Sequence, residues 1–418
     1  MKILLATDSF PPVCGGSGWS TYELARGLRT LGHSIVIVQP RPGSRGVHEK
    51  TVDEFRVLEV GADAPPIPYI RNYYKNEKLF ADLADYLTNV IAPERIDIIH
   101  GQHVMTSVPA VRAAQRSSIP AVCTVRDYWP VCYWSDLIHT DRSLELCPGC
   151  SAAMMTQCVR PHAGVLWPLS LPMIPYMRGN LLRKQRGLGD ADAIIAVSST
   201  IAADLRARSP AMAAARVEII PNAVDVVALR HRAAASAPPM NGPYALYLGK
   251  LAPNKGTASL VHVIERSGLD WPVIIAGDGP EREAIARDAA RSTRDIRFVG
   301  WVDQPTATAW LAHASLLLFP SRGPESLSRV LIEASALGIP IAAMNTGGTP
   351  DIVVDERTGL LSRDFAELAD DVRRLRDDAT LRQRLGDAAR AHAETRFDVS
   401  VVMPRVEQLY RDLLRRRR

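Results

Sequence analysis

The sequence LLLFPSRGPESLSRVLIEASALGIPIAAMNTGG, residues 316–348, decides the fold of this chain. Leu316–Phe319 is an apolar run of strand length, and it ends in a loop that contains two prolines. Apolar residues then recur at helical spacing as far as Leu337, and Gly338 follows as a helix stop. Ile339–Ala343 is a second apolar strand. A strand, a loop, a helix and a strand in this order predict the parallel sheet of an α/β protein.

Two carboxylates flank the predicted helix. Glu325 lies in the loop before it, and Glu333 lies eight positions further on. Because side chains on a helix lean toward its N-terminus, Glu333 can reach back toward the same end as Glu325. The backbone amides of residues 327–329 (Leu327, Ser328 and Arg329) lie at that end and suit an anion such as phosphate. The alternative is a surface helix with two solvated acids.

This segment resembles the signature of glycosyltransferase family 4, whose members transfer sugars from nucleotide sugars with retention. Glu325 and Glu333 match the E-x7-E element of the family. At residues 327–329 the chain departs from it, since many members carry an aromatic residue, a glycine and an aliphatic residue there. The resemblance implies two Rossmann-like doubly wound parallel-sheet domains that face a cleft, the GT-B fold. It also places Glu325 at the reacting sugar and Glu333 at the ribose of the donor.

Length and composition agree with a globular protein of two or three domains. The 418 residues are 47% hydrophobic and 23% charged, which is typical of a globular chain with an ample core. The net charge of +5 is mild, so no nucleic-acid partner is expected. The start, MKILLATDSF, predicts a first strand rather than a signal peptide, and no apolar run has the length of a membrane span. We therefore expect a cytoplasmic protein with reduced cysteines.

A glycine-rich crossover follows the first strand. Ile3–Ala6 is a buried strand, Gly15 to Gly18 form a turn, and a helical pattern starts at Thr21. Glycines at a βαβ crossover let backbone amides approach a bound group. A tight turn alone is the other interpretation, and the absence of G-x-G-x-x-G disfavours a dinucleotide. The resemblance places Gly15 and Gly16 against the donor sugar and its diphosphate.

The strand at Ala121–Val125 ends in Arg126 and Asp127. The family often has a histidine at the first of these positions, where it contacts the donor sugar. An arginine cannot act as a base, but it can bind a diphosphate or an acidic sugar. We place Arg126 and Asp127 with Glu325 in the predicted catalytic group. The alternative is a structural pair of Arg126 with Asp127, and His100 and His103 are either substitutes or bystanders.

A second glycine-bearing loop follows the strand Ala245–Leu248. It carries Lys250 and Lys255, and two lysines five positions apart can clamp an anion. In the family this loop binds the diphosphate; Lys255 matches the family lysine, and Lys250 stands where arginine is usual. Donor-binding residues implied at the neighbouring strand ends are Gly277, Gly279 and Val302.

Four cysteines lie within 27 residues, and two of them form a C-x2-C knuckle. Reduced thiolates at such spacing predict a structural zinc site, although the other gaps are looser. Free or loosely packed thiols are the alternative. The four residues are Cys132, Cys147, Cys150 and Cys158.

The predicted domains follow from these patterns. An N-terminal Rossmann-like, acceptor-side domain spans 1–232 and contains an irregular cysteine-rich insertion at 130–190. A linker at 233–243 leads to a C-terminal, nucleotide-sugar-binding Rossmann-like domain at 244–397. A final helix at 398–418 packs back on the first domain.

Two basic segments suggest a surface role. Residues 165–187 are apolar with a basic edge, and the chain ends in the four arginines Arg415–Arg418. Such segments can lie on a membrane face, so peripheral contact with the inner membrane face is one interpretation. A helix that packs against its own domain is the other.

The resemblance implies a retaining hexosyltransferase that moves a sugar from a nucleoside diphosphate sugar to a glycan, lipid-linked or small-molecule acceptor. Catalysis would require no metal or other cofactor. The alternatives are an epimerase of the same architecture and a non-catalytic nucleotide-sugar-binding protein. A phosphorylase would need a pyridoxal phosphate lysine, and no lysine is singled out for that role.

Overall fold

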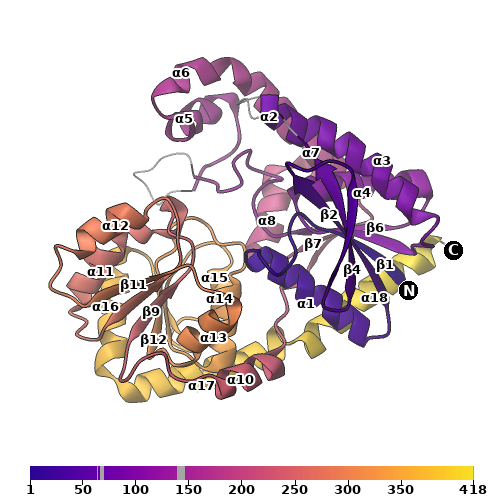
Figure 1. The fold of residues 1–418 in the computed structure, drawn as a ribbon. Coiled ribbons are helices and arrows are strands. Elements are labelled where there is room, and N and C mark those ends of the chain that lie inside the picture. Colours follow the sequence, from indigo (N-terminus) through magenta and orange to yellow (C-terminus); the bar gives the residue numbers. More distant parts are fainter. Residues whose placement is uncertain (64, 66–69, 139–145, 418) are drawn as a thin grey trace. The chain divides into compact units, whose positions relative to one another are not determined.

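The structure, a computed structural model, describes residues 1–63, 65, 70–138 and 146–417. The chain divides into two compact units. Unit 1 comprises Met1–Ser135, Cys147–Ala223 and Val399–Arg418, and unit 2 comprises Asp136–Leu146 and Val224–Asp398. Each unit is a parallel sheet covered by helices (Figure 1), so the predicted α/β class with two Rossmann-like sheets is confirmed.

Unit 1 is built on an eight-stranded sheet in the order β3-β4-β2-β1-β5-β6-β7-β8. Neighbouring strands are parallel, except that β3 pairs antiparallel with β4. The central strands are buried on both faces, which explains their continuous apolar sequences. The strands are β1 (Lys2–Ala6), β2 (Ser34–Pro42), β3 (Val47–Val52), β4 (Phe55–Ala62), β5 (Ile98–Gly101), β6 (Ala121–Val125), β7 (Ala193–Ala196) and β8 (Val217–Ile219).

Helices connect these strands and cover both faces of the sheet. They are α1 (Gly16–Thr30), α2 (Ile70–Tyr73), η1 (Tyr74–Lys78), α3 (Leu79–Ile91), α4 (Val104–Ser117), α5 (Ala152–Ala163), η2 (Gly164–Leu166), α6 (Trp167–Ser170), η3 (Leu171–Met173), α7 (Ile174–Gly189), α8 (Ser199–Arg208), α9 (Pro210–Ala213) and α18 (Val399–Arg417).

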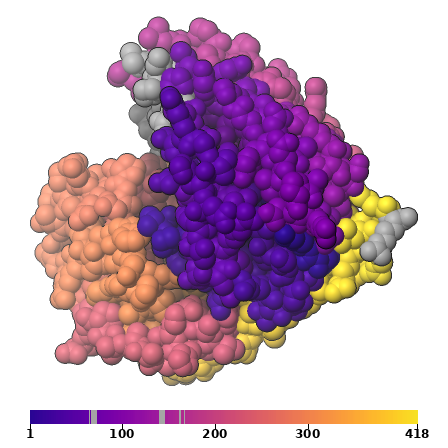
Figure 2. Space-filling view, turned by 45° about the vertical axis from the view of Figure 1, so that its right-hand side comes forward, coloured from indigo at the N-terminus to yellow at the C-terminus, as the bar shows by residue number. Residues whose placement is uncertain are grey.

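The C-terminal helix α18 completes the core of unit 1, as predicted. Its apolar residues recur every three or four positions and join the cluster under β1 and α1. Tyr410 on α18 is fully buried, and its hydroxyl lies 2.5 Å from Nδ1 of His100 on β5. Burial lowers the pKa of His100 well below its usual range, so its ring is neutral. Figure 2 shows the yellow C-terminal segment reaching the surface along one edge of unit 1.

Unit 2 is built on a six-stranded parallel sheet in the order β11-β10-β9-β12-β13-β14. Its strands are β9 (Ala245–Leu248), β10 (Val273–Ala276), β11 (Ile296–Gly300), β12 (Leu316–Phe319), β13 (Ile341–Met344) and β14 (Leu360–Ser362). Its helices are α10 (Val226–Ala235), η4 (Pro253–Lys255), η5 (Thr257–Ser259), α11 (Leu260–Ser267), α12 (Arg282–Ala289), α13 (Gln304–Ala312), α14 (Arg329–Leu337), α15 (Thr349–Ile352), α16 (Phe365–Asp377) and α17 (Ala379–Arg396).

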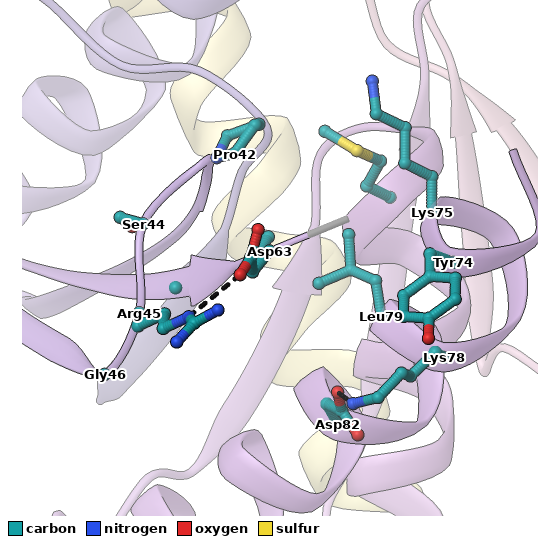
Figure 3. A pocket seen from close by; sticks show the side chains of 13 residues that line it. Pro42, Ser44, Arg45, Gly46, Asp63, Tyr74, Lys75, Lys78, Leu79 and Asp82 are labelled. Atoms are coloured by element: carbon teal, nitrogen blue, oxygen red, sulfur yellow. Dashed lines mark hydrogen bonds and ion pairs between the residues drawn. The ribbon is translucent and has the colours of Figure 1, made fainter. Parts of the chain in front are cut away.

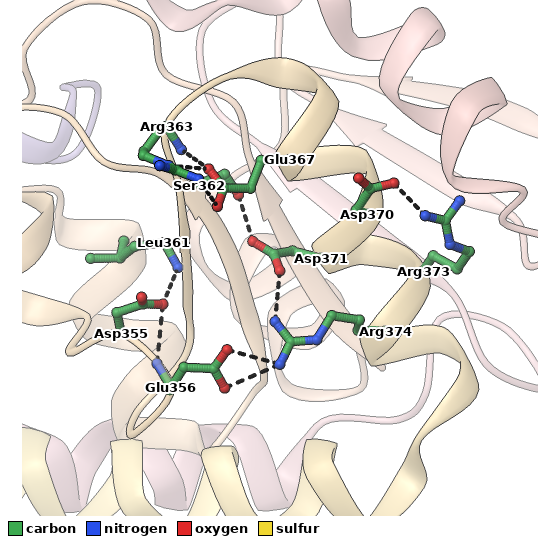
Figure 4. Close-up of polar contacts among 10 residues, drawn as sticks. All are labelled: Asp355, Glu356, Leu361, Ser362, Arg363, Glu367, Asp370, Asp371, Arg373 and Arg374. Atoms are coloured by element: carbon green, nitrogen blue, oxygen red, sulfur yellow. Dashed lines mark hydrogen bonds and ion pairs between the residues drawn. The ribbon is translucent and has the colours of Figure 1, made fainter.

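Polar contacts tie the last strand of unit 2 to helix α16 (Figure 4). Ser362 at the end of β14 donates to Asp371 on α16 over 2.8 Å. Arg374, one turn along the same helix, donates to Asp371 and also to Glu356 in the turn before β14. Asp355 in that turn accepts from the backbone N–H of Leu361. The edge of the sheet is therefore held by a network rather than by single ion pairs.

Three segments differ from the sequence-based expectation. The glycines expected to form a turn lie at the start of helix α1, with Gly15 as its N-cap and Gly16 as its first residue. Residues 130–190, expected to be irregular, contain α5, α6 and α7. Prolines of this region stand in the first turns of η3 and α7, where proline is tolerated. The expected linker at 233–243 begins inside α10.

We expect Tyr410→Phe to lower the free energy of unfolding of unit 1 by about 1–3 kcal/mol. The ring keeps its packing, whereas Nδ1 of the buried His100 loses its hydroxyl partner. Chemical denaturation followed by circular dichroism measures this loss. Tyr22→Phe is the matched control, since its hydroxyl contacts Asp53 in an exposed position where water replaces it. Equal losses for the two variants would contradict the expectation.

Candidate functional site

The predicted donor residues of unit 2 gather at the carboxyl edge of its sheet. Lys250 and Lys255 follow β9, and Glu325 follows the adjacent β12. The strand order reverses between these two strands, since β10 lies on the far side of β9. Ligands of doubly wound sheets bind outside the strand ends at such a reversal. The sequence-predicted residues therefore lie where this fold binds ligands.

Glu325 is held by two donors. Lys255 Nζ lies 2.5 Å from Glu325 Oε1, and the hydroxyl of Ser321 donates to the same oxygen. Glu325 is 8% exposed, and a buried carboxylate is tolerated only when it is paired. No described residue donates to its second oxygen, Oε2. Lys250 is exposed to solvent.

Two glycines allow the loops around Glu325 to approach one another. A Cβ on Gly277, whose φ is +143°, would lie 1.8 Å from the carbonyl oxygen of Gly249. A Cβ on Gly347, whose φ is +54°, would lie 2.1 Å from the carbonyl oxygen of Glu325. Only glycine fits either position. Gly279 approaches the loop after β9 in the same way, at the carbonyl of Leu251.

Helix α14 carries the second carboxylate. Arg329 is the first residue of α14, and its Nε donates to Glu333 Oε1 over 2.7 Å. Both side chains are largely buried, at 7% and 15% exposure. Ser328 caps the helix without a side-chain hydrogen bond, and Leu327 is buried. Val302 follows β11 at the same edge of the sheet and is half-buried.

The glycines of the first crossover lie at the carboxyl edge of unit 1. Gly15 caps helix α1, and Gly16 is its first residue. A Cβ on Gly15 would meet no atom within 4 Å. Packing within unit 1 therefore does not require a glycine at position 15, which is consistent with a bound group close to it.

Among the described residues, Arg126 contacts neutral groups only. Its Nε donates to Asn222 Oδ1 over 2.9 Å, and its Nη1 donates to the side-chain and backbone oxygens of Gln102. Asp127 instead accepts from the backbone N–H of Trp129. Burial lowers the pKa of Arg126 to about 9, which still leaves it charged at neutral pH. Burial raises the pKa of Asp127 to about 6. The structure thus does not show the predicted alternative pair of Arg126 with Asp127.

The two histidines near Arg126 differ in role. His100 bonds to Tyr410 and to Thr124 Oγ1, so it is structural. His103 lies at the edge of the sheet, beside the backbone N–H of Asp8. Sequence reasoning missed Asp8, although its place directly after the first strand marks the carboxyl edge.

A pocket of about 200 Å³ opens beside β2 and β4 in unit 1 (Figure 3). One wall carries Arg45 and Asp63, which form an ion pair 2.9 Å long. The other wall carries Tyr74, Lys75 and Lys78. The pocket has cations on both walls, and the sequence analysis did not indicate it.

The four cysteines lie near one another in unit 1. Cys158 is on α5, and burial, followed by the nearby thiols of Cys132 and Cys150, raises its pKa to about 12. Cys147 donates to the carbonyl of Gly149 within the knuckle. Within the described ranges, no three His, Cys, Asp or Glu side chains are arranged to hold a metal ion. The zinc site stays a prediction that this arrangement does not support, and metal analysis of the purified protein tests it.

The segments considered for membrane contact are helical. Val165 and Leu169 are 94% and 71% exposed. At the end of α18, Arg415 pairs with Asp412 and Arg417 with Asp192. Arg418 lies outside the described residues. None of the helices in the described part of the chain is long and apolar enough to cross a membrane.

Two family models match the chain. Residues 14–227, more than half of the chain, match the model of Glycosyltransferase Family 4. Residues 242–378 match the model of Glycosyl transferases group 1.

Similar proteins match either nearly all of the chain or part of it. The glycogen synthase of Mycobacterium tuberculosis is 26% identical over 439 residues, which cover 98% of this chain and 94% of the relative. The phosphatidyl-myo-inositol mannosyltransferase of Mycobacterium leprae is 33% identical over 199 residues, 46% of this chain and 52% of the relative.

Among solved structures, sucrose-phosphate synthase from Thermosynechococcus elongatus superposes with a TM-score of 0.70 at 21% identity, over 99% of this chain and 98% of the other. Anabaena HepE in complex with UDP-glucose gives 0.66 at 17% identity, over 99% and 100%. These two show the fold. The chain is therefore a hexosyltransferase-type enzyme of glycosyltransferase family 4, built on the GT-B fold, that takes its sugar from a nucleotide-sugar donor.

Proposed function

We propose that this enzyme transfers its sugar with retention of anomeric configuration. The donor is a nucleoside diphosphate sugar that binds to unit 2, and the acceptor is a glycan, a lipid-linked glycan or a small molecule that binds to unit 1. The proposal rests on the arrangement of Glu325 at the carboxyl edge of unit 2. There a buried carboxylate, Glu325, is anchored through one oxygen while the other has no donor among the described residues.

The residues of unit 2 have distinct roles under this proposal. Lys250 and Lys255 neutralise the diphosphate as it leaves, which stabilises the charge that develops in the transition state. The start of α14 adds backbone amides and the positive end of its dipole. Glu325 Oε2 accepts from a hydroxyl of the transferred sugar, and Glu333 accepts from the ribose.

Gly277, Gly279 and Val302 offer backbone groups to the base. In unit 1, Gly15 and Gly16 leave room for the sugar and diphosphate, and Arg126 receives an anionic group of the substrate. Arg126 is cationic and has no carboxylate among its described partners, which supports a substrate anion for it. Asp127 shares the strand end with Arg126.

The proposal is tested by incubating a panel of nucleoside diphosphate sugars with cell-envelope and metabolite extracts. Mass spectrometry identifies the product, and NMR of its anomeric carbon assigns the configuration. Inversion would overturn retention. Epimerisation of the donor, with no transfer to any acceptor, would favour the epimerase. Donor binding without turnover would favour the non-catalytic alternative.

We also propose that the enzyme acts in the cytoplasm, with peripheral contact of residues 165–187 and the arginine-rich end with the inner membrane face. The exposed Val165 and Leu169 support this contact, since large apolar side chains this exposed are costly in water. Sedimentation with anionic vesicles tests it, and a protein that stays in the supernatant would end the idea.

The two carboxylates are predicted to act differently. We expect Glu325→Gln to lower kcat by about ten- to a hundredfold with little change in donor affinity, because its charged hydrogen bond is at the reacting sugar. We expect Glu333→Gln to weaken donor binding instead. Steady-state kinetics and calorimetric titration with the donor separate the effects. Glu283→Gln, an exposed acid of the same unit, is the control. Loss of affinity alone in both variants would contradict the assignment.

Lys255→Ala is expected to weaken binding of the free nucleoside diphosphate about tenfold or more, while the nucleoside alone binds nearly unchanged. The lysine contacts phosphate under the proposal, and the nucleoside has none. Calorimetry with the two ligands measures the difference. If both ligands lose affinity equally, Lys255 is not a phosphate contact.

Arg126→His restores the residue common in the family, yet we expect it to reduce kcat at saturating donor by about tenfold or more. The variant removes a permanent cation from a position with neutral partners only. Arg116→His, which changes an exposed arginine paired with Asp85, is the control. Undiminished turnover of Arg126→His would remove Arg126 from the active site.

A further inference from the structure

Helix α14 begins with a buried cation. Arg329 is its first residue, and its Nε donates to Glu333 Oε1 over 2.7 Å. The two side chains lie four positions apart, so they share one face of the helix. Arg329 also belongs to the stretch in which the chain departs from the family signature, residues 327–329. The signature therefore does not account for this pair.

Helix stability does not account for the pair either. The first turn of a helix is the positive end of its dipole, where a cation is disfavoured. An arginine four positions before a glutamate is also the weaker order for such a pair, since an acid stabilises a helix more when it comes first. Burial adds the cost of removing two charges from water, and hydrophobic residues of similar volume often stabilise a protein as well or better. These effects favour a role for Arg329 outside the stability of α14.

The pair restricts the carboxylate of Glu333. A glutamate side chain has several rotatable bonds, and a charged hydrogen bond to one oxygen limits the rotamers that it can adopt. Arg329 engages Oε1, whereas no described residue donates to Oε2. The side chain of Glu333 is 15% exposed, so the carboxylate is not sealed inside the unit. Arg329 thus holds one oxygen of Glu333 while the other has no described donor.

Glu325 is held in the same way. Its Oε1 accepts from Lys255 Nζ and from the hydroxyl of Ser321, and its Oε2 has no donor among the described residues. In both cases a cation of unit 2 holds one oxygen of a largely buried carboxylate, and the second oxygen is left over. The repeated arrangement favours a common purpose, which is to offer an oriented acceptor to a hydroxyl of a ligand.

We propose that Arg329 is a positioning residue of the donor site. It holds Glu333 Oε1 so that Oε2 accepts from a ribose hydroxyl, and binding of the donor thereby depends on that hydroxyl. This inference rests on the proposed function, which places Glu333 at the ribose, and it adds the residue that orients Glu333. Loss of Arg329 then reduces the preference for a ribonucleoside diphosphate over its deoxy forms, whereas loss of a merely structural arginine leaves that preference unchanged.

Calorimetric titration of the full chain tests the proposal. The probes are UDP, ADP and GDP, each in its ribo, 2′-deoxy and 3′-deoxy form. For the nucleotide that binds most tightly, the hydroxyl preference is the Kd of the weaker deoxy form divided by the Kd of the ribo form. Equal weakening of all forms leaves this ratio unchanged, so the ratio separates recognition of the ribose from general damage to the site.

Substitutions at position 329 separate the hydrogen bond from the charge. Arg329→Met keeps an unbranched side chain but removes both. Arg329→Gln places an amide N–H as many bonds from the backbone as Nε, so it keeps a donor without the charge. Arg329→Ala is a second removal variant, since alanine is the best helix former. Glu333→Gln is the benchmark for the ribose contact itself.

The matched control is Arg363→Met. Arg363 donates through Nε to Glu367 over 3.0 Å with the same spacing and order (Figure 4), but its side chain is 83% exposed. An exposed pair of this kind contributes little to stability. Its removal therefore reports only on the exchange of an arginine for a methionine in unit 2.

We expect a hydroxyl preference of about tenfold or more for the unaltered protein and for Arg363→Met, because both keep the charged hydrogen bond to the ribose. The preference falls to about threefold or less in Glu333→Gln and Arg329→Met, and Arg329→Gln retains a value between these limits. An unchanged preference in folded Arg329→Met overturns the proposal, and so does a preference in Arg329→Gln as low as in Arg329→Met. Circular dichroism reports folding, and Arg329→Ala decides if Arg329→Met is not folded.

The same titrations distinguish this inference from the proposed function. If Glu333→Gln loses the preference and Arg329→Met keeps it, this inference alone fails. If the unaltered protein shows no preference, or Glu333→Gln keeps it, the ribose role of Glu333 fails and the inference falls with it. If none of the nucleotides binds at millimolar concentration, the proposed donor site itself fails.

Discussion

Backbone segments at the carboxyl edge of unit 2 pack so closely that two positions in its loops have no room for a side chain. Gly277 lies against the carbonyl of Gly249, and Gly347 lies against that of Glu325. The backbone N–H of Gly348 also donates to Glu325 O over 2.6 Å. The loop at Gly347 and Gly348 therefore holds the main chain of Glu325, while its side chain is held by Lys255. A group held in this way needs no reorganisation when charge develops beside it.

Much of this arrangement was predictable from the sequence. Residues 316–319 and the helix before Gly338 were correctly placed because their apolar period and their stop signals agree. The signature around Glu325 and Glu333 indicated the family and the edge of the sheet. The pairing of Lys255 with Glu325 was not predictable, since 70 residues separate them and only the adjacency of β9 and β12 brings them together.

The misses have physical causes as well. The helices between Ala152 and Gly189 were not delimited from the sequence, where a packed helix over 165–187 was one of two interpretations. Prolines that begin a helix resemble prolines that end one. Asp8 and Lys184 carry no motif. They come close together only because of the strand order and because α7 carries Lys184, which lies 176 residues after Asp8 in the sequence. Neither hydrophobic periodicity nor motif spacing predicts such proximity. The two carboxyl edges also differ in electrostatics: in unit 2 Glu325 and Glu333 pair directly with Lys255 and Arg329. In unit 1 burial shifts the pKa values of Asp8, Asp127 and Lys184 toward the neutral forms.

The division of unit 1 over three stretches of sequence sets an order for biosynthesis. A ribosome delivers residues 1–223 early, but the helix that covers their core, α18, follows only after unit 2. Unit 2 is almost continuous in sequence, and all of its strands have left the ribosome once residue 398 has emerged. During synthesis, the apolar surface around His100 therefore stays open until unit 2 is complete, and the nascent chain exposes that surface to chaperones until α18 emerges.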